Sequence, residues 1–248
     1  MLLAISLLQL ANGVLILIFL FLGFKFIETN WSYKISKPYA WDEAVKQGFP
    51  SKKLKKIERF YRDKVRFYTF WFQIERLRKE AVPGAFAEVG VYKGETARII
   101  HTMDPARPLH LFDTFTGFHE KDLESEKSGA TDLVDFSDTS VERVRTFIEG
   151  NENVIFHPGH FPETAENLSE EKFAFVHLDA DLYMPTLAAL RFFYQRLSPG
   201  GTILVHDYNH NWEGIRKAVH EFSATMPETI MEIPDWQGSV MIIRNKAS

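Results

Sequence analysis

The chain has 248 residues, a formal net charge of −4 and no cysteine. This length suits one domain with an appendage, and the absence of cysteine excludes disulfides and thiolate chemistry. The slightly acidic balance argues against a general nucleic-acid-binding protein, which would carry an excess of basic residues.

The amino-terminal segment from Leu2 to Phe24 has no charged side chain. About 20 apolar residues are enough to span a bilayer, so residues 1–24 are interpreted as a single transmembrane anchor. The alternative is a cleaved signal peptide, but no basic stretch precedes the apolar run, which also continues past the usual length of a signal core. Because lysines follow the segment, the positive-inside rule predicts that the rest of the chain lies in the cytoplasm.

Residues 25–56 form a basic connector next to the predicted anchor. The lysines between Lys52 and Lys56 are interpreted either as a contact with anionic lipid or as a solvated helix face. Residues 51–80 contain neither glycine nor proline, which predicts one or two helices. A buried helix face is predicted from apolar residues at spacings of three, four and seven. These residues are Phe60, Phe67, Phe70, Trp71, Ile74 and Leu77.

Short apolar segments alternate with helical ones from residue 85 onward. Strands are predicted at 85–91, 109–112, 154–157, 173–178 and 201–206. Helices are predicted at 95–103, 140–149, 185–197 and 214–225, with a turn at 199–201. A closing antiparallel hairpin is predicted from 229–233 and 239–244. This alternation is typical of a doubly wound, mostly parallel α/β sheet. The polar residues 119–138 are interpreted as a lid over substrate or as a solvated insertion.

A loop with two glycines follows the first predicted strand and opens a helix. Gly90 and Gly94 let the backbone approach a ligand, and the start of the helix offers free N–H groups, although their spacing is not the dinucleotide motif GxGxxG. Asp113, at the end of the second strand, is placed to bind ribose hydroxyls. The charge of Glu88 favours the cationic S-adenosylmethionine over NAD, although this residue is alternatively a loop cap.

Two later strands end in acidic residues. Neighbouring parallel strands lie about 4.8 Å apart and end at the same edge of a sheet, so Asp179 and Asp207 are expected to converge. Converging carboxylates indicate a cation, a shared proton or a polar substrate. Asp181 is interpreted as a site residue or as a helix N-cap. His177 lies inside an apolar strand and is interpreted as a core residue.

Four motifs occur in matching order between residues 57 and 244. They are VPGAFAEVGV at 82–91, LFDTFTGF at 111–118, DADLY at 179–183 with Thr186, and PGG at 199–201 with HDY at 206–208. Together they resemble the macrocin O-methyltransferase family, which uses S-adenosylmethionine and a metal ion to methylate sugar hydroxyls. The resemblance implies a seven-strand class I methyltransferase domain over residues 57–248, closed by a C-terminal antiparallel hairpin.

The resemblance also implies the residues of the site. Cofactor contacts are expected from Glu88, Gly90, Tyr92, Gly94, Asp113 and Ser140. Ligands for a divalent metal, magnesium or manganese, are expected at Asp179, His206 and Asp207. The family has a carboxylate where this chain has His206, and imidazole suits softer ions than magnesium. His206 is therefore interpreted as a ligand for a transition metal, as a base, or as the mark of a weak or lost metal site.

The predicted reaction is direct transfer of the sulfonium methyl to a hydroxyl of a sugar, glycolipid or similar acceptor. Asp179, His206 and His210, in that order, are the candidates for the base that removes the hydroxyl proton. The acceptor is expected to be a small molecule or a glycan- or lipid-linked hydroxyl, and a homo-oligomer is left open. The alternatives are a non-catalytic, membrane-anchored scaffold with the methyltransferase fold, and an NAD-type oxidoreductase.

Overall fold

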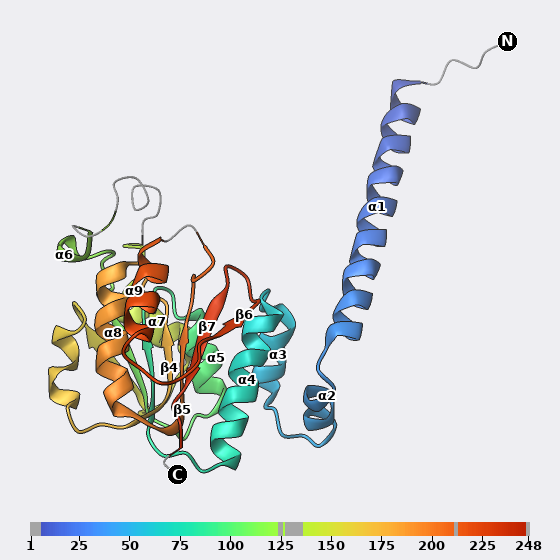
Figure 1. Ribbon diagram of the computed structural model, residues 1–248. Coiled ribbons are helices and arrows are strands. Elements are labelled where there is room, and N and C mark those ends of the chain that lie inside the picture. Colours follow the sequence, from blue (N-terminus) through green and yellow to red (C-terminus); the bar gives the residue numbers. More distant parts are fainter. Residues whose placement is uncertain (1–5, 124–125, 127–135, 211–212, 247–248) are drawn as a thin grey trace. The chain divides into compact units, whose positions relative to one another are not determined.

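The computed structural model describes residues 6–123, 126, 136–210 and 213–246, of which residues 30–36 are described as backbone only (Figure 1). The chain divides into two compact units, residues 1–51 and residues 52–248.

The first unit contains α1 (Leu7–Ser36) and α2 (Tyr39–Lys46). Within α1, Leu7–Thr29 is long and apolar enough to cross a membrane. Ser6 caps this helix, because its hydroxyl accepts from the Gln9 N–H while the Gln9 side chain accepts from the Ser6 N–H. Length and composition do not distinguish an anchor from a signal sequence, so the anchor remains a prediction.

The second unit begins with two helices, α3 (Lys52–Phe60) and α4 (Lys64–Lys79). Residues 61–63 connect the two helices. The Asp63 carboxylate accepts from the Arg66 N–H and caps α4. The predicted apolar face of α4 is buried against the sheet. The prediction for Phe60 was wrong, because α3 ends there and leaves this ring 70% exposed. The helical spacing that buries the other five residues does not continue across the break.

A seven-stranded sheet forms the centre of the second unit. Its strands are β1 (Ala85–Val89), β2 (Leu109–Asp113), β3 (Val154–Pro158), β4 (Phe173–Leu178), β5 (Leu197–Val205), β6 (Met231–Ile233) and β7 (Ser239–Ile243). They lie in the order β3-β2-β1-β4-β5-β7-β6. The first five are parallel, and β7 runs antiparallel to both β5 and β6. The predicted fold class and closing hairpin are confirmed.

Helices cover both faces of the sheet (Figure 1). The remaining ones are α5 (Glu95–Met103), α6 (Glu120–Leu123), α7 (Val141–Ile148), α8 (Tyr183–Arg196), α9 (Glu213–Ser223) and a 3₁₀ helix at Glu163–Leu168. On one face α8 packs against β4, β5 and α9, while on the other α4 packs against β4 and β5, and α5 contacts α3, α4 and α7. The connections between the parallel strands therefore pass over both faces of the sheet. The loops that follow these strands lie together at the carboxyl ends.

One predicted turn is instead part of a strand. Pro199–Gly201 was expected to precede the last parallel strand, but β5 already begins at Leu197. The physical reason is pairing with the end of the chain: the Gly200 N–H donates to the Arg244 carbonyl, and the Arg244 N–H donates to the Gly201 carbonyl, both at 2.9 Å. These bonds hold the segment in the sheet despite its glycines.

Candidate active site

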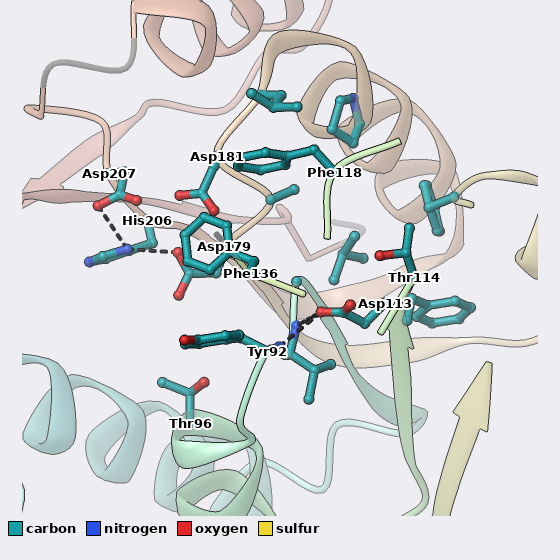
Figure 2. Close-up of a pocket in the computed structure, with 18 of the residues that line it drawn as sticks. Tyr92, Thr96, Asp113, Thr114, Phe118, Phe136, Asp179, Asp181, His206 and Asp207 are labelled. Atoms are coloured by element: carbon teal, nitrogen blue, oxygen red, sulfur yellow. Dashed lines mark hydrogen bonds and ion pairs between the residues drawn. The ribbon is translucent and has the colours of Figure 1, made fainter. Parts of the chain in front are cut away.

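A cavity of about 620 Å³ lies at the carboxyl ends of β1, β2, β4 and β5 (Figure 2). Its walls come from the loops that follow these four strands and β3, together with Tyr61, Arg66 and Gln237. The strand order changes direction between β1 and β4, and ligands of open α/β sheets bind at such a switch point. The topology therefore places this cavity where a cofactor is expected to bind.

Asp113 joins the loop after β1 to the end of β2. One carboxylate oxygen accepts from the N–H groups of Val91 and Tyr92, at 2.7 and 2.8 Å, and the other accepts from the Phe115 N–H at 2.6 Å (Figure 2). A carboxylate has about four acceptor positions, so roughly one remains free toward the cavity. Asp113 thus shapes the loop and can also accept a hydrogen bond from a ligand. The sequence indicated only the second role.

The two glycines of this loop are required by packing. A Cβ at Gly90, whose φ is +83°, would lie 2.0 Å from the carbonyl oxygen of Asp179. A Cβ at Gly94, whose φ is +82°, would lie 2.8 Å from the Val144 side chain. Glycine at these positions therefore lets β1 approach β4 and lets α5 approach α7. Both glycines and Tyr92 line the cavity, and the Tyr92 hydroxyl donates to Asp138 at 2.7 Å.

Two predicted cofactor residues do not line the cavity. Glu88 is fully buried, and its carboxylate lies 2.7 Å from Nδ1 of His177, which is also fully buried. Burial raises the pKa of Glu88, an effect that the hydrogen bond from His177 only partly offsets. Ser140 caps α7 by accepting from the Arg143 N–H. His177 is a core residue, as expected. It is paired with Glu88, which was expected to contact the cofactor.

Asp179, His206 and Asp207 lie together at the cavity wall, with their potential ligand atoms within 4.8 Å of one another. Nδ1 of His206 is 2.8 Å from Asp179 and 3.0 Å from Asp207 (Figure 2). The other ring nitrogen, Nε2, lies 3.1 Å from the carbonyl oxygen of Trp236. Since a carbonyl only accepts, Nε2 carries a proton, and Nδ1 is the atom that faces both carboxylates.

The charges of this cluster stabilise each other. Burial opposes the charged form of His206, but the attraction and hydrogen bonding of the two carboxylates outweigh it and raise the pKa of the ring to about 10. Burial also opposes ionisation of Asp179, yet the positive charge of His206 keeps the pKa of this carboxyl well below its usual range. At neutral pH the cluster is therefore an imidazolium held between carboxylates.

Asp181 is a further cavity residue whose role the sequence left open. The N-cap of α8 is Leu182, and it makes no side-chain capping bond, so the interpretation of Asp181 as the helix cap was wrong. Burial and the negative charges of Asp179 and Asp207 raise the pKa of Asp181 well above its usual range. The raised pKa favours the protonated form of this carboxyl, which can donate a hydrogen bond.

Four non-glycine residues that line the cavity have positive φ, a conformation that the sequence did not indicate. They are Tyr92, Asp181, Asp207 and Gln237, with φ of 47°, 61°, 60° and 77°. Such residues cost on the order of 1–3 kcal/mol each and cluster at functional sites.

His210 also lines the cavity and is exposed. Most of the polar segment 119–138 lies outside the described residues, so the choice between lid and insertion stays a prediction.

The fold and the position of the cavity define the chain as a class I methyltransferase-type α/β protein. The family model "Macrocin-O-methyltransferase (TylF)" matches residues 62–242. The chain therefore belongs to the macrocin O-methyltransferase family, which confirms the resemblance.

Two curated relatives act on sugar-bearing natural products according to their names. One is the 8-demethyl-8-(2,3-dimethoxy-alpha-L-rhamnosyl)-tetracenomycin-C 4'-O-methyltransferase of Streptomyces olivaceus, 29% identical over 60% of this chain and 61% of the relative. The other is the mycinamicin III 3''-O-methyltransferase of Micromonospora griseorubida, 31% identical over 60% of this chain and 64% of the relative. This chain thus spans less than two thirds of either relative.

Solved structures agree with the fold. The O-methyltransferase NovP is similar with a TM-score of 0.63 at 25% identity, covering 74% of this chain and 81% of NovP. A calicheamicin methyltransferase is similar with a TM-score of 0.56 at 18% identity, covering 87% of this chain and 90% of that one. The second likeness supports the fold alone.

Proposed function

We propose that this chain is an S-adenosylmethionine-dependent O-methyltransferase that methylates a sugar hydroxyl. The observation that carries the proposal is a single cavity in which a carboxylate suited to ribose, Asp113, shares the rim of the sheet with the buried cluster of Asp179, His206 and Asp207. Family membership supports the reaction class, and the sugar-bearing substrates named for the relatives support the acceptor class. The NAD alternative has no such support.

The residues of the cavity fit the donor. S-adenosylmethionine supplies an electrophilic methyl group on a cationic sulfonium. Asp113 would accept from the ribose hydroxyls through its free acceptor position, and the free N–H groups at the start of α5 would bind the donor's carboxylate. Phe136 packs edge-to-face on Tyr92 and Phe118, at 5.0 and 5.1 Å between ring centroids, and this aromatic group would exclude water.

The acceptor hydroxyl must lose its proton as the methyl group arrives. His206 does not serve as the base, because both of its ring nitrogens face acceptors and carry protons at neutral pH. We assign proton removal to Asp179, which is ionised and partly exposed to the cavity, with His206 holding it in position. His210, exposed at the rim, is the second candidate. Asp181, in the protonated form that its raised pKa favours, would donate a hydrogen bond to the acceptor.

The cluster also fits a divalent metal. The Trp236 carbonyl fixes the proton of His206 on Nε2, which is the usual outer contact of a metal-binding histidine. Nδ1 and the oxygens of Asp179 and Asp207 would then be the ligands, provided that Nδ1 gives up its proton. A metal there would polarise the acceptor hydroxyl. One imidazole with two carboxylates favours manganese or a similar transition metal over magnesium.

Changing His206→Asp is expected to shift this preference toward magnesium, because it replaces the imidazole with a hard oxygen ligand. We expect manganese to raise the thermal midpoint of the wild-type chain at a lower concentration than magnesium does. In the variant, the half-saturating magnesium concentration should fall by at least about tenfold. His220→Asp, on α9 and outside the cluster, is the control. Identical responses to both ions in all three proteins would contradict the metal assignment.

We also propose that α1 anchors the chain and leaves the second unit in the cytoplasm. The length and apolar character of Leu7–Thr29 support the anchor, and the lysines after it support the orientation.

The proposed reaction is tested by mass spectrometry of glycolipids and soluble glycans from cells that make the wild-type chain, the Asp179→Asn variant or no protein. The wild type is expected to yield a sugar species one methyl group heavier, which the other two lack. Absence of any methylated sugar from all three would favour the non-catalytic scaffold.

A further inference from the structure

A second cavity of about 400 Å³ adjoins the first and is not needed by the donor. Its walls come from the junction of α3 and α4, the first turn of α5, the end of α7 and the turn between β6 and β7. Tyr61, Arg66, Glu95 and Gln237 line both cavities. A molecule whose hydroxyl lies at the Asp179 cluster can therefore extend into the second space.

Trp236 forms a fixed aromatic wall of this second cavity. Its carbonyl accepts from Nη2 of Arg66 at 3.0 Å and from His206 at 3.1 Å, and its N–H donates to Asp63 at 2.7 Å. The backbone is thus held from three sides, yet the indole is 64% exposed. An exposed ring on a fixed backbone offers a flat surface at little entropic cost, and one face of a sugar ring stacks on such a surface.

The charged groups of the second cavity favour an anion. Arg62 is exposed and makes no hydrogen bond or ion pair within the described part of the chain. Arg98 lies 4.7 Å from the centre of the Phe147 ring, and its buried Nε has no partner among the described residues. Its Nη2 is only loosely paired with exposed Glu149, at 3.4 Å. Guanidinium groups with free N–H donors bind phosphate and carboxylate oxygens.

Asp63, one of the two acids that line this cavity, is already bound within the protein. Asp63 uses one oxygen for the Arg66 N–H at 2.9 Å and the other for the Trp236 N–H. The Arg66 guanidinium is paired in turn with Asp235 and Asp63. Glu95 lies between the two cavities at the start of α5. Arg62 and Arg98 are therefore the cationic side chains of the second cavity that remain available to a ligand.

We propose that the second cavity binds a phosphorylated sugar, with Trp236 stacking on the sugar ring and with Arg62 and Arg98 binding the phosphoryl group. The proposal rests on the proposed function and adds the class of acceptor: a sugar phosphate ester. Two guanidinium groups, one from the α3–α4 connection and one from α5, suit the several anionic oxygens of a phosphoryl group better than a single carboxylate. A lipid-linked sugar and a nucleotide-linked sugar both carry this ester.

The test measures binding to the full-length chain in phosphatidylcholine nanodiscs by calorimetry, with rhamnose 1-phosphate and rhamnose as the probes. We expect rhamnose 1-phosphate to bind at least about tenfold more tightly than rhamnose. Trp236→Ala should weaken both probes. Arg62→Gln should remove the preference for the phosphorylated one. Arg191→Gln, an exposed arginine on α8, is the matched control and should change neither.

S-adenosylhomocysteine is titrated into the same samples, and Arg62→Gln should bind it as the wild type does, because Arg62 lines only the second cavity. Wild-type protein that binds S-adenosylhomocysteine but not rhamnose 1-phosphate preferentially overturns this inference alone. Wild-type protein that binds no S-adenosylhomocysteine overturns the proposed function, and the inference with it. A second arm compares polyprenyl-phosphate rhamnose in phosphatidylcholine vesicles with a soluble nucleoside diphosphate rhamnose, and the tighter ligand identifies the source.

Discussion

Replacing Gly90 with alanine is expected to destabilise the second unit by roughly 4 kcal/mol. The added Cβ would lie 2.0 Å from the Asp179 carbonyl, so β1 and β4 would have to separate where the two halves of the cavity meet. The backbone at this position, with φ of +83°, adds strain for any residue that has a Cβ. Chemical denaturation of the full chain in detergent, followed by circular dichroism, measures the loss.

The Gly117→Ala variant separates the effect of the close Cβ contact from the effect of the positive φ. Its φ of +94° is similarly unfavourable, but its nearest neighbour would be 3.5 Å away, in ordinary contact. This control should lose only about 1–2 kcal/mol. Equal losses in the two variants would mean that the close approach of β1 to β4 does not hold the cavity together.

Asp113→Ala is expected to weaken the binding of S-adenosylhomocysteine at least about 100-fold. The change removes the acceptor for the ribose hydroxyls and also leaves the N–H groups of Val91, Tyr92 and Phe115 without their partner. A hydrogen bond to a charged group contributes about 1.5–3 kcal/mol, so loss of the one ribose contact that fits the free acceptor position, together with the loosened loop, accounts for such a decrease. Isothermal titration calorimetry on the full chain measures it.

The matched control for this variant is Asp138→Ala. Asp138 contacts the same loop from the outside, through the Tyr92 hydroxyl at 2.7 Å and the Lys93 ammonium at 2.6 Å, and it is exposed. Surface ion pairs contribute little, so this change should alter the affinity by less than about threefold. A similar loss in both variants would show that the loop, and not the Asp113 carboxylate, determines donor binding.

Much of this fold was predictable because it follows from local patterns. Alternating strands and helices define a doubly wound sheet, and the ends of neighbouring parallel strands meet at one edge. That geometry is why the placement of Asp179 beside Asp207 could be expected from their positions after two consecutive strands. The closing hairpin was predicted from the pattern of residues 229–244, while the seven-strand class I sheet was implied by the family resemblance, which the family match supports.

The remaining features depend on contacts between residues far apart in the chain. Glu88 and Val89 point to opposite faces of β1, but every residue of this strand is buried, so the apolar pattern does not reveal which side chain faces the cavity. The turn at Trp236 is held by Asp63 and Arg66, which precede it by about 170 residues. No local pattern predicts these bonds or the positive φ of Asp181 and Asp207.

We infer that the methyl donor binds along the same rim of the sheet as the acidic cluster. A crystal structure of the full-length chain with S-adenosylhomocysteine tests it most directly. We expect the ribose on the Asp113 carboxylate and the sulfur facing Asp179, with His206 still between Asp179 and Asp207. Density for the nucleoside outside this cavity, or an Asp179 side chain turned away from the sulfur, would contradict it.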